Sequence, residues 1–150
     1  MVNRVDYRRH SAQNLVNHVD QTIGTQMSVI TPPADPTHEL GDTRFTSLAT
    51  PSRGSTDTSV WIAELDPGAT SVPHSLTREE IFVVLAGHAS ITLDGEVQTA
   101  AESDVIVVPA GVELMLGNAA DTPLRLLCCM AVGGRARLAD GSLLTPPWSE

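Results

Sequence analysis

From Arg44 onward the chain consists of short runs of apolar and β-branched residues that follow one another at nearly regular spacing. Turn signals separate these runs, namely Asp66-Pro67-Gly68, Asp94-Gly95 and Pro109-Ala110-Gly111. Asp-Gly between two such runs is typical of a tight hairpin, because both central residues of a type I′ turn need positive φ. Many short strands with almost no helical periodicity predict an all-β sandwich or barrel. The expected strands are Arg44–Ala49, Thr58–Asp66, Ser71–Ser75, Glu80–Leu85, His88–Leu93, Glu96–Thr99, Asp104–Val108, Val112–Leu116 and Leu124–Val132.

Two of the expected strands are apolar on both faces. The runs Ile81–Leu85 and Val105–Val108 lack the alternation that a strand shows when it lies between a core and water. We therefore expect something to cover their outer face. The cover would be the N-terminal arm, a second sheet of the same chain or a second subunit, and the last option predicts a homodimer.

Residues 1–40 differ from the rest and are predicted to form a mostly irregular N-terminal arm, with the folded domain at residues 41–150. The best helical periodicity in the arm is Ser11–Asp20, which would place Leu15, Val16 and Val19 on one stripe. The proline-rich segment Thr31–Pro36 then breaks regular structure, so this part of the arm is expected to cross the domain in extended form.

Composition excludes several classes of function. At 150 residues the chain is long enough for one domain with a substantial core. Its net charge is −9, and its nine basic residues are all arginines, so it lacks the clustered cations of a nucleic-acid-binding protein. The absence of lysine excludes Schiff-base chemistry within the chain. No apolar run approaches the ~20 residues of a membrane span, and no signal-peptide pattern opens the sequence.

The two cysteines, Cys128 and Cys129, are adjacent in an apolar run. Neighbours on a strand point to opposite faces, so a disulfide between them is geometrically disfavoured. Small buried thiols of this kind are typical of a reducing compartment. We therefore expect an acidic, soluble protein of the cytoplasm.

Two segments share a pattern of turn residues and candidate metal ligands. The first runs Gly68, five residues, His74-Ser75-Leu76, three residues, Glu80, six residues and Gly87. The second runs Ser103-Asp104, four residues, Pro109-Ala110-Gly111, then Leu114 and Asn118. These segments resemble the two motifs of the cupin family, and the resemblance extends over about residues 44–132. It implies a cupin-type jelly-roll β-barrel.

In the cupin family the first motif supplies two histidines and a glutamate, the second supplies a third histidine, and together they hold a divalent metal. The resemblance places His74 and Glu80 on two of these positions, while Leu76 and Leu114 occupy the other two. Transition metals in proteins usually have at least three protein ligands. We therefore expect no resident metal cofactor. A divalent metal held by His74 and Glu80 alone would bind weakly.

Without a metal, His74 and Glu80 form a candidate acid–base pair, because a histidine and a carboxyl in a partly apolar barrel can move protons on a bound molecule. We expect a small organic molecule as the partner, and an isomerase or cyclase type of reaction. Two alternatives stay open: a metal-dependent oxygenase whose ligand set is completed from elsewhere, for example by His38, and a non-catalytic binding or structural protein. Neither the substrate nor the role of the arm follows from the sequence. The residues expected to line the pocket are Trp61, Leu76, Phe82, Leu114, Leu116 and Met130.

Overall fold

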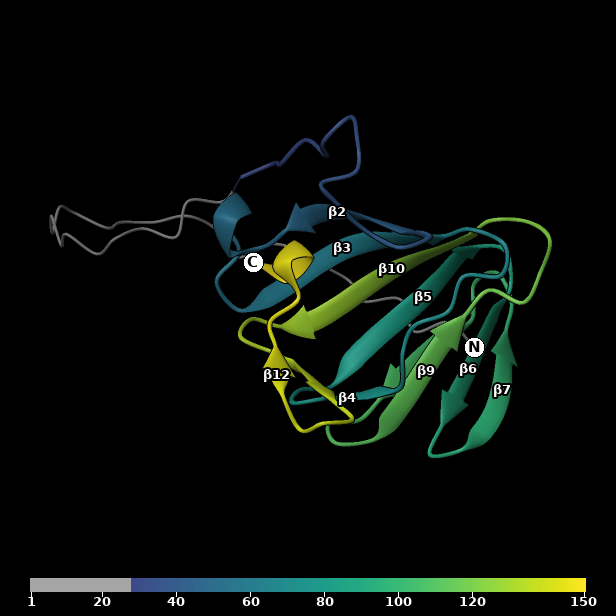
Figure 1. Ribbon diagram of the computed structural model, residues 1–150. Helices are drawn as coiled ribbons and strands as arrows, with labels where there is room; N and C mark the ends of the chain where they lie inside the picture. Colours follow the sequence, from purple (N-terminus) through teal and green to yellow (C-terminus); the bar gives the residue numbers. More distant parts are fainter. Residues whose placement is uncertain (1–27) are drawn as a thin grey trace, which may run out of the picture.

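The computed structural model describes residues 28–150, which fold into two six-stranded antiparallel sheets packed face to face (Figure 1). Sheet A has the order β1-β2-β3-β10-β5-β8, and sheet B has the order β12-β11-β4-β9-β6-β7. This arrangement is the predicted all-β jelly roll. The strands are β1 (His38–Leu40), β2 (Thr43–Ala49), β3 (Thr58–Leu65), β4 (His74–Leu76), β5 (Glu80–Ala86), β6 (Ala89–Leu93), β7 (Glu96–Ala100), β8 (Val105–Val108), β9 (Glu113–Gly117), β10 (Leu124–Ala131), β11 (Ala136–Leu138) and β12 (Leu143–Leu144), and the two short 3₁₀ helices are η1 (Pro51–Arg53) and η2 (Pro147–Ser149).

Each of the nine predicted strands has a counterpart in the structure. The predicted hairpin turn at Asp94-Gly95 joins β6 to β7, and both residues have positive φ, 45° and 85°. The strand expected at Ser71–Ser75 begins only at His74, because Pro73 has no N–H to donate to a ladder. Strands β1, β11 and β12 are short and were not predicted, and β1 extends sheet A with residues assigned above to the arm. The helix expected at Ser11–Asp20 lies outside the described residues.

Strand register places the inward-facing side chains of sheet A in rows that run across the strands. One row, which we call the Glu80 row, joins β3, β10, β5 and β8 in the order Ser59, Met130, Glu80 and Val108. All four of these residues are buried. A second row, which we call the Phe82 row, lies one interior position along and contains Ser47, Trp61, Cys128, Phe82 and Ile106.

The outer face of sheet A is covered only in part by the described residues. Residues 32–36 lie beside β2, β3 and β10, where they border a cavity of about 340 Å³ together with Ile62. Sheet B covers the inner face and leaves the outer face of β5 and β8 bare. Val105 and Val107 of β8 accordingly remain 56% and 50% exposed.

Candidate functional site

Glu80 is a carboxyl group at the first position of β5, inside the barrel. Its side chain is 6% exposed, and its Cα partners are Met130 of β10 and Val108 of β8. Within residues 28–150, no hydrogen bond or ion pair reaches the Glu80 carboxyl from another group, and its oxygens keep a small contact with solvent, because no fully enclosed side-chain oxygen in this part of the chain lacks a partner. A buried carboxyl usually has such a partner, since burial of an unpaired polar group costs free energy.

Burial raises the pKa of Glu80 from 4.5 to about 8. The cause is desolvation, which disfavours the charged form of a carboxyl in apolar surroundings. At neutral pH the group is therefore mostly protonated. A protonated carboxyl can donate a hydrogen bond or a proton, as a general acid does.

The two cysteines face opposite sides of β10, as predicted. Cys128 points inward in the Phe82 row and is buried, whereas Cys129 is half-buried on the outer face. Burial, and secondarily the nearby Glu80, raises the pKa of the Cys128 thiol well above its usual value. Cys128 is thus a protonated thiol beside the carboxyl and lacks the thiolate character of a nucleophile.

His74 begins β4 in the opposite sheet and is half-buried. Its Nδ1 lies 2.8 Å from the carbonyl oxygen of Val72, so a proton on Nδ1 would be donated to that oxygen. Such a hydrogen bond leaves Nε2 of a neutral imidazole free to accept a proton. The structure shows no hydrogen bond or ion pair between His74 and Glu80, so it does not bring the expected pair into contact.

The two leucines at motif positions lie inside the barrel. Leu76 follows His74 by two residues on β4 and is 3% exposed, and Leu114 of β9 is the Cα partner of His74 and is 1% exposed. In residues 28–150 there is no group of three or more histidine, cysteine, aspartate or glutamate side chains that could hold a metal ion. The side chains at the four motif positions, two of them leucines, therefore do not fit a resident metal with ligands from the described part of the chain.

His38 does not supply the missing ligand. It lies on β1 at the outer edge of sheet A, with β2, β3 and β10 between it and the strand of Glu80. At about 4.8 Å per strand, that separation is roughly 19 Å. Its Nδ1 instead lies 3.0 Å from the Thr37 hydroxyl.

The six residues expected to line a pocket are all buried and belong to one hydrophobic cluster. Sheet A contributes three of them and sheet B the other three, so the packing of the two sheets brings them together. Met130 is the strand partner of Glu80, but none of the six lines the cavity beside residues 32–36 or the one between the edge strands described below. They are Trp61, Phe82, Met130, Leu76, Leu114 and Leu116.

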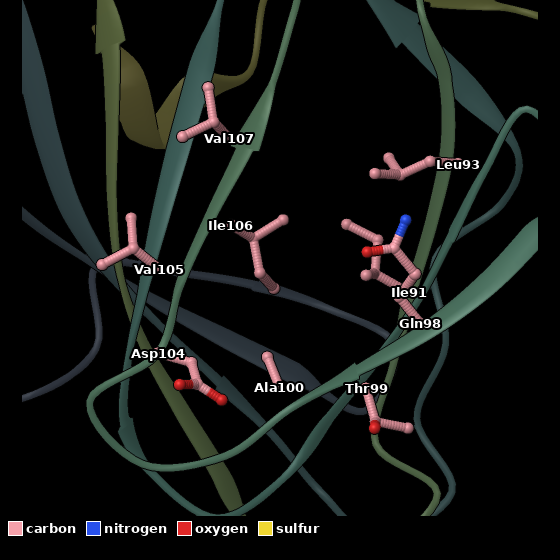
Figure 2. Close-up of a pocket in the computed structure, with 9 residues that line it drawn as sticks. All are labelled: Ile91, Leu93, Gln98, Thr99, Ala100, Asp104, Val105, Ile106 and Val107. Atoms are coloured by element: carbon pink, nitrogen blue, oxygen red, sulfur yellow. The ribbon is translucent and has the colours of Figure 1, made fainter.

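A cavity of about 240 Å³ opens between the edge strands of the two sheets (Figure 2). Ile106 of β8 faces Ile91 of β6 across it, and polar side chains of β7 and Asp104 lie toward its rim. Ile106 and Val108 share the inner face of β8, and Val108 is the strand partner of Glu80. On the inner face of β8 the cavity wall therefore ends at Ile106, about 7 Å from the Glu80 row, which is the spacing of two residues along a strand.

The backbone explains two positions of the motifs. Gly87 has φ +84°, and a Cβ placed on it would lie 2.5 Å from the carbonyl oxygen of Pro123, so another residue would clash there. Ser103, which stands where the family has glycine, also has positive φ, at 74°. The turn before β8 thus keeps the left-handed conformation of the motif with a residue that adopts it less readily.

Comparison with known proteins agrees with this geometry. Residues 61–130 match the family model described as "Cupin domain". Solved structures similar in fold include the polyketide cyclase RemF from Streptomyces resistomycificus, with a TM-score of 0.62 and 17% identity over 73% of this chain and 80% of that one. KdgF from Halomonas sp. has a TM-score of 0.56 and 18% identity over 64% and 84% of the two chains. Residues 61–130 thus form a cupin domain within a cupin-type jelly roll.

One curated relative is an uncharacterized protein, MJ1618 of Methanocaldococcus jannaschii, which is 36% identical over 53 residues. The match covers 35% of this chain, and the chain spans 42% of that relative's length. The plu4264 protein from Photorhabdus luminescens has a TM-score of 0.60 and 23% identity over 69% of this chain and 88% of that one.

Two polar residues of sheet A that face the interior were not predicted from the sequence. Ser47 and Ser59 are the β2 and β3 members of the Phe82 and Glu80 rows, and both are buried. The period-two alternation with Trp61 could have placed Ser59 on the inner face. Its alignment with Glu80 depends on the register of β10 with two neighbours, which a single sequence does not encode.

Proposed function

We propose that this protein binds a small, largely apolar organic molecule inside its barrel and acts on it as a metal-independent isomerase or cyclase of the cytoplasm. Glu80 donates a proton to the bound molecule, and His74 accepts one from it through Nε2. Isomerisation and cyclisation rearrange a single molecule, so they need no oxidant, reductant or second substrate.

The observation that carries this proposal is the buried Glu80 carboxyl without a hydrogen-bond partner. Packing alone gives no reason to keep an ionisable group there, since an apolar side chain of similar volume would avoid the cost of burial. A carboxyl with a pKa of about 8 is suited to proton transfer near neutral pH. The apolar walls around it match the general composition of small-molecule sites.

The comparisons support the same class of activity. One structural neighbour is named a polyketide cyclase, which shows that this fold can host a cyclase. At 17% identity that likeness concerns the fold, so the reaction of the present protein is our proposal. Two of the four metal-ligand positions of the family's motifs are leucines here, and residues 28–150 contain no group of three or more side chains that could hold a metal ion. No observation in these residues therefore favours a metal-dependent oxygenase.

Native mass spectrometry of the purified protein, after exposure to cell extract, should identify a bound organic molecule. With that molecule as substrate, Glu80→Gln and His74→Ala should each reduce turnover by about a hundredfold or more, as expected for the loss of general acid–base groups. Glu79→Gln and His88→Ala are the matched controls, because both side chains are exposed, Glu79 next to Glu80 in sequence and His88 between β5 and β6. Unchanged turnover in both site variants would refute the catalytic roles, and binding without turnover would indicate a non-catalytic binding protein.

We further propose a homodimer formed through the outer face of sheet A. Two rows of apolar side chains lie there in register, Val60, Cys129, Ile81 and Val107 in one, and Ile62, Leu127, Val83 and Val105 in the other. In sedimentation experiments at micromolar concentration the protein should be a dimer, and Val107→Arg should convert it to a folded monomer because a charge would be buried in the contact. Val97→Arg, at an exposed position of sheet B, should leave the dimer intact. A monomeric wild-type protein would contradict the proposal.

A further inference from the structure

The side of the sandwich away from the cavity in Figure 2 is closed by the segment 146–149. After β12 the chain crosses to sheet A, and η2 lies against β2 and β3 (Figure 1). The indole ring of Trp148 stacks on the ring of Phe45, with ring centroids 3.6 Å apart and planes 1° from parallel. Phe45 is a buried residue on the inner face of β2. A planar aromatic group therefore already occupies a slot on the interior surface of sheet A.

The same slot carries two hydrogen-bond donors. The Ser47 hydroxyl donates to the carbonyl oxygen of Trp148 at 2.8 Å, and the Ser59 hydroxyl donates to that of Ser149 at 2.6 Å. Both serines are buried on the inner face of sheet A. The surface under η2 thus combines an aromatic ring with two hydroxyl groups that point to carbonyl oxygens.

We propose that the slot formed by Phe45, Ser47 and Ser59 is a binding site for a planar aromatic molecule that bears carbonyl or hydroxyl oxygens, and that Trp148 fills it as an internal competitor. The inference rests on the proposed function and narrows its substrate class. The ligand displaces η2, stacks on Phe45 and takes over the hydrogen bonds that Ser47 and Ser59 give to the segment.

The stacking geometry favours such an exchange. When two electron-rich rings lie directly face to face, their quadrupoles repel each other, so aromatic pairs prefer offset or edge-to-face arrangements. A ring that carries carbonyl groups is poorer in electrons and stacks more favourably on Phe45. The oxygens of the ligand also satisfy the Ser59 hydroxyl, which would otherwise be left buried without its partner when η2 moves away, whereas Ser47 keeps its contact with the Thr37 hydroxyl at 3.1 Å.

The slot also leads to Glu80. Ser59 and Glu80 belong to the same row and are separated by one strand, so they lie roughly 10 Å apart. Met130 lies between them, and its flexible side chain packs so closely on Gly134 that a Cβ there would overlap it. Because methionine adapts readily to its surroundings, a fused-ring molecule anchored at Ser59 can extend over Met130 toward the carboxyl.

The test is calorimetric titration with 2-acetylnaphthalene, an uncharged planar ketone, beside cyclohexyl methyl ketone as a non-planar control. Trp148→Ala should bind 2-acetylnaphthalene at least about tenfold more tightly than the wild-type protein, and neither should bind the control ketone with comparable affinity. Phe45→Leu in the Trp148→Ala background should abolish the gain. Leu144→Ala, which alters an exposed residue of β12, should retain the wild-type affinity.

Circular dichroism and the emission of the buried Trp61 establish that each variant is folded. If Trp148→Ala unfolds, Trp148→Leu keeps an apolar cover without a planar ring and should show a gain in the same direction. Equal affinities in the wild-type protein and the variant, a gain that survives Phe45→Leu, or no binding in either would overturn the inference. The gain in affinity of Trp148→Ala is measured by binding alone, so the slot can be recognised even if Glu80 proves to have no catalytic role. Conversely, turnover that depends on Glu80 with no effect of Trp148→Ala would refute the slot alone.

Discussion

The protein should lose stability between pH 5 and pH 8, and replacing Glu80 with glutamine should remove most of that loss. The folded-state pKa is raised to about 8 from 4.5, so the folded chain binds more protons than the unfolded chain in this window. The favourable contribution of the neutral carboxyl is fully present below pH 4.5 and is lost as the pH rises through 8. Each unit of pKa shift corresponds to about 1.4 kcal/mol, so the wild-type protein should lose roughly 2–4 kcal/mol.

Urea unfolding at pH 5 and pH 8.5 measures this difference. Glutamine cannot ionise, so the variant should be the more stable of the two proteins at pH 8.5. Glu79→Gln removes the adjacent, exposed carboxyl and should keep the pH dependence of the wild-type protein. Equal pH dependence in the wild-type protein and Glu80→Gln would show that the Glu80 carboxyl is ionised at neutral pH, and this would remove its role as a general acid.

Restoring histidine at both leucine positions, Leu76→His with Leu114→His, should create a tight zinc or nickel site. Both leucines are inside the barrel, one two residues from His74 and the other paired with it across β4 and β9. With Glu80 the variant would have three imidazoles and one carboxyl, enough to bind a transition metal. Without metal the variant should be less stable than the wild-type protein by several kcal/mol, because leucine packing is lost and polar rings are buried.

Thermal unfolding with and without metal, together with elemental analysis, tests this prediction. Metal at a hundredfold excess over its dissociation constant should recover about 2.7 kcal/mol of stability. The matched control is Leu143→His with Leu144→His, since these leucines are exposed neighbours on β12 and should produce no interior site. A variant that folds but binds no metal would show that the four motif positions do not converge. Stoichiometric metal in the wild-type protein would reveal a ligand outside the described residues.

Most of the fold was predictable from local pattern. Period-two alternation and turn residues placed nine strands, and the Asp94-Gly95 hairpin followed from the backbone demands of its turn. The start of β4 was predicted too early. Val72 and Pro73 are both compatible with extended backbone, but Pro73 has no N–H to donate to a neighbouring strand. Strands β11 and β12 were not predicted, because they are only three and two residues long and too short for a periodic signal.

The candidate site was predictable only in part. Motif spacing placed Glu80 and the two leucines inside the barrel, and the structure agrees. It did not reveal that His74 bonds to the backbone of Val72 and forms no hydrogen bond or ion pair with Glu80, because that depends on the conformation of the turn before β4. Because Cys128 and Cys129 are adjacent on a strand, the sequence predicts that they point to opposite faces of the sheet. It does not show which of the two points into the barrel.

The sequence by itself determined the class of the fold: alternating short strands, glycines at turn positions and two motifs with leucine at two of the four ligand positions predict a cupin-type jelly roll with an incomplete set of metal ligands. Those features are local, since they depend on residues a few positions apart. The tertiary structure decided what surrounds Glu80, because burial and the absence of a hydrogen-bond partner result from strands far apart in sequence. It also decided that Trp148 covers Phe45, a contact between residues more than a hundred positions apart that no local pattern encodes.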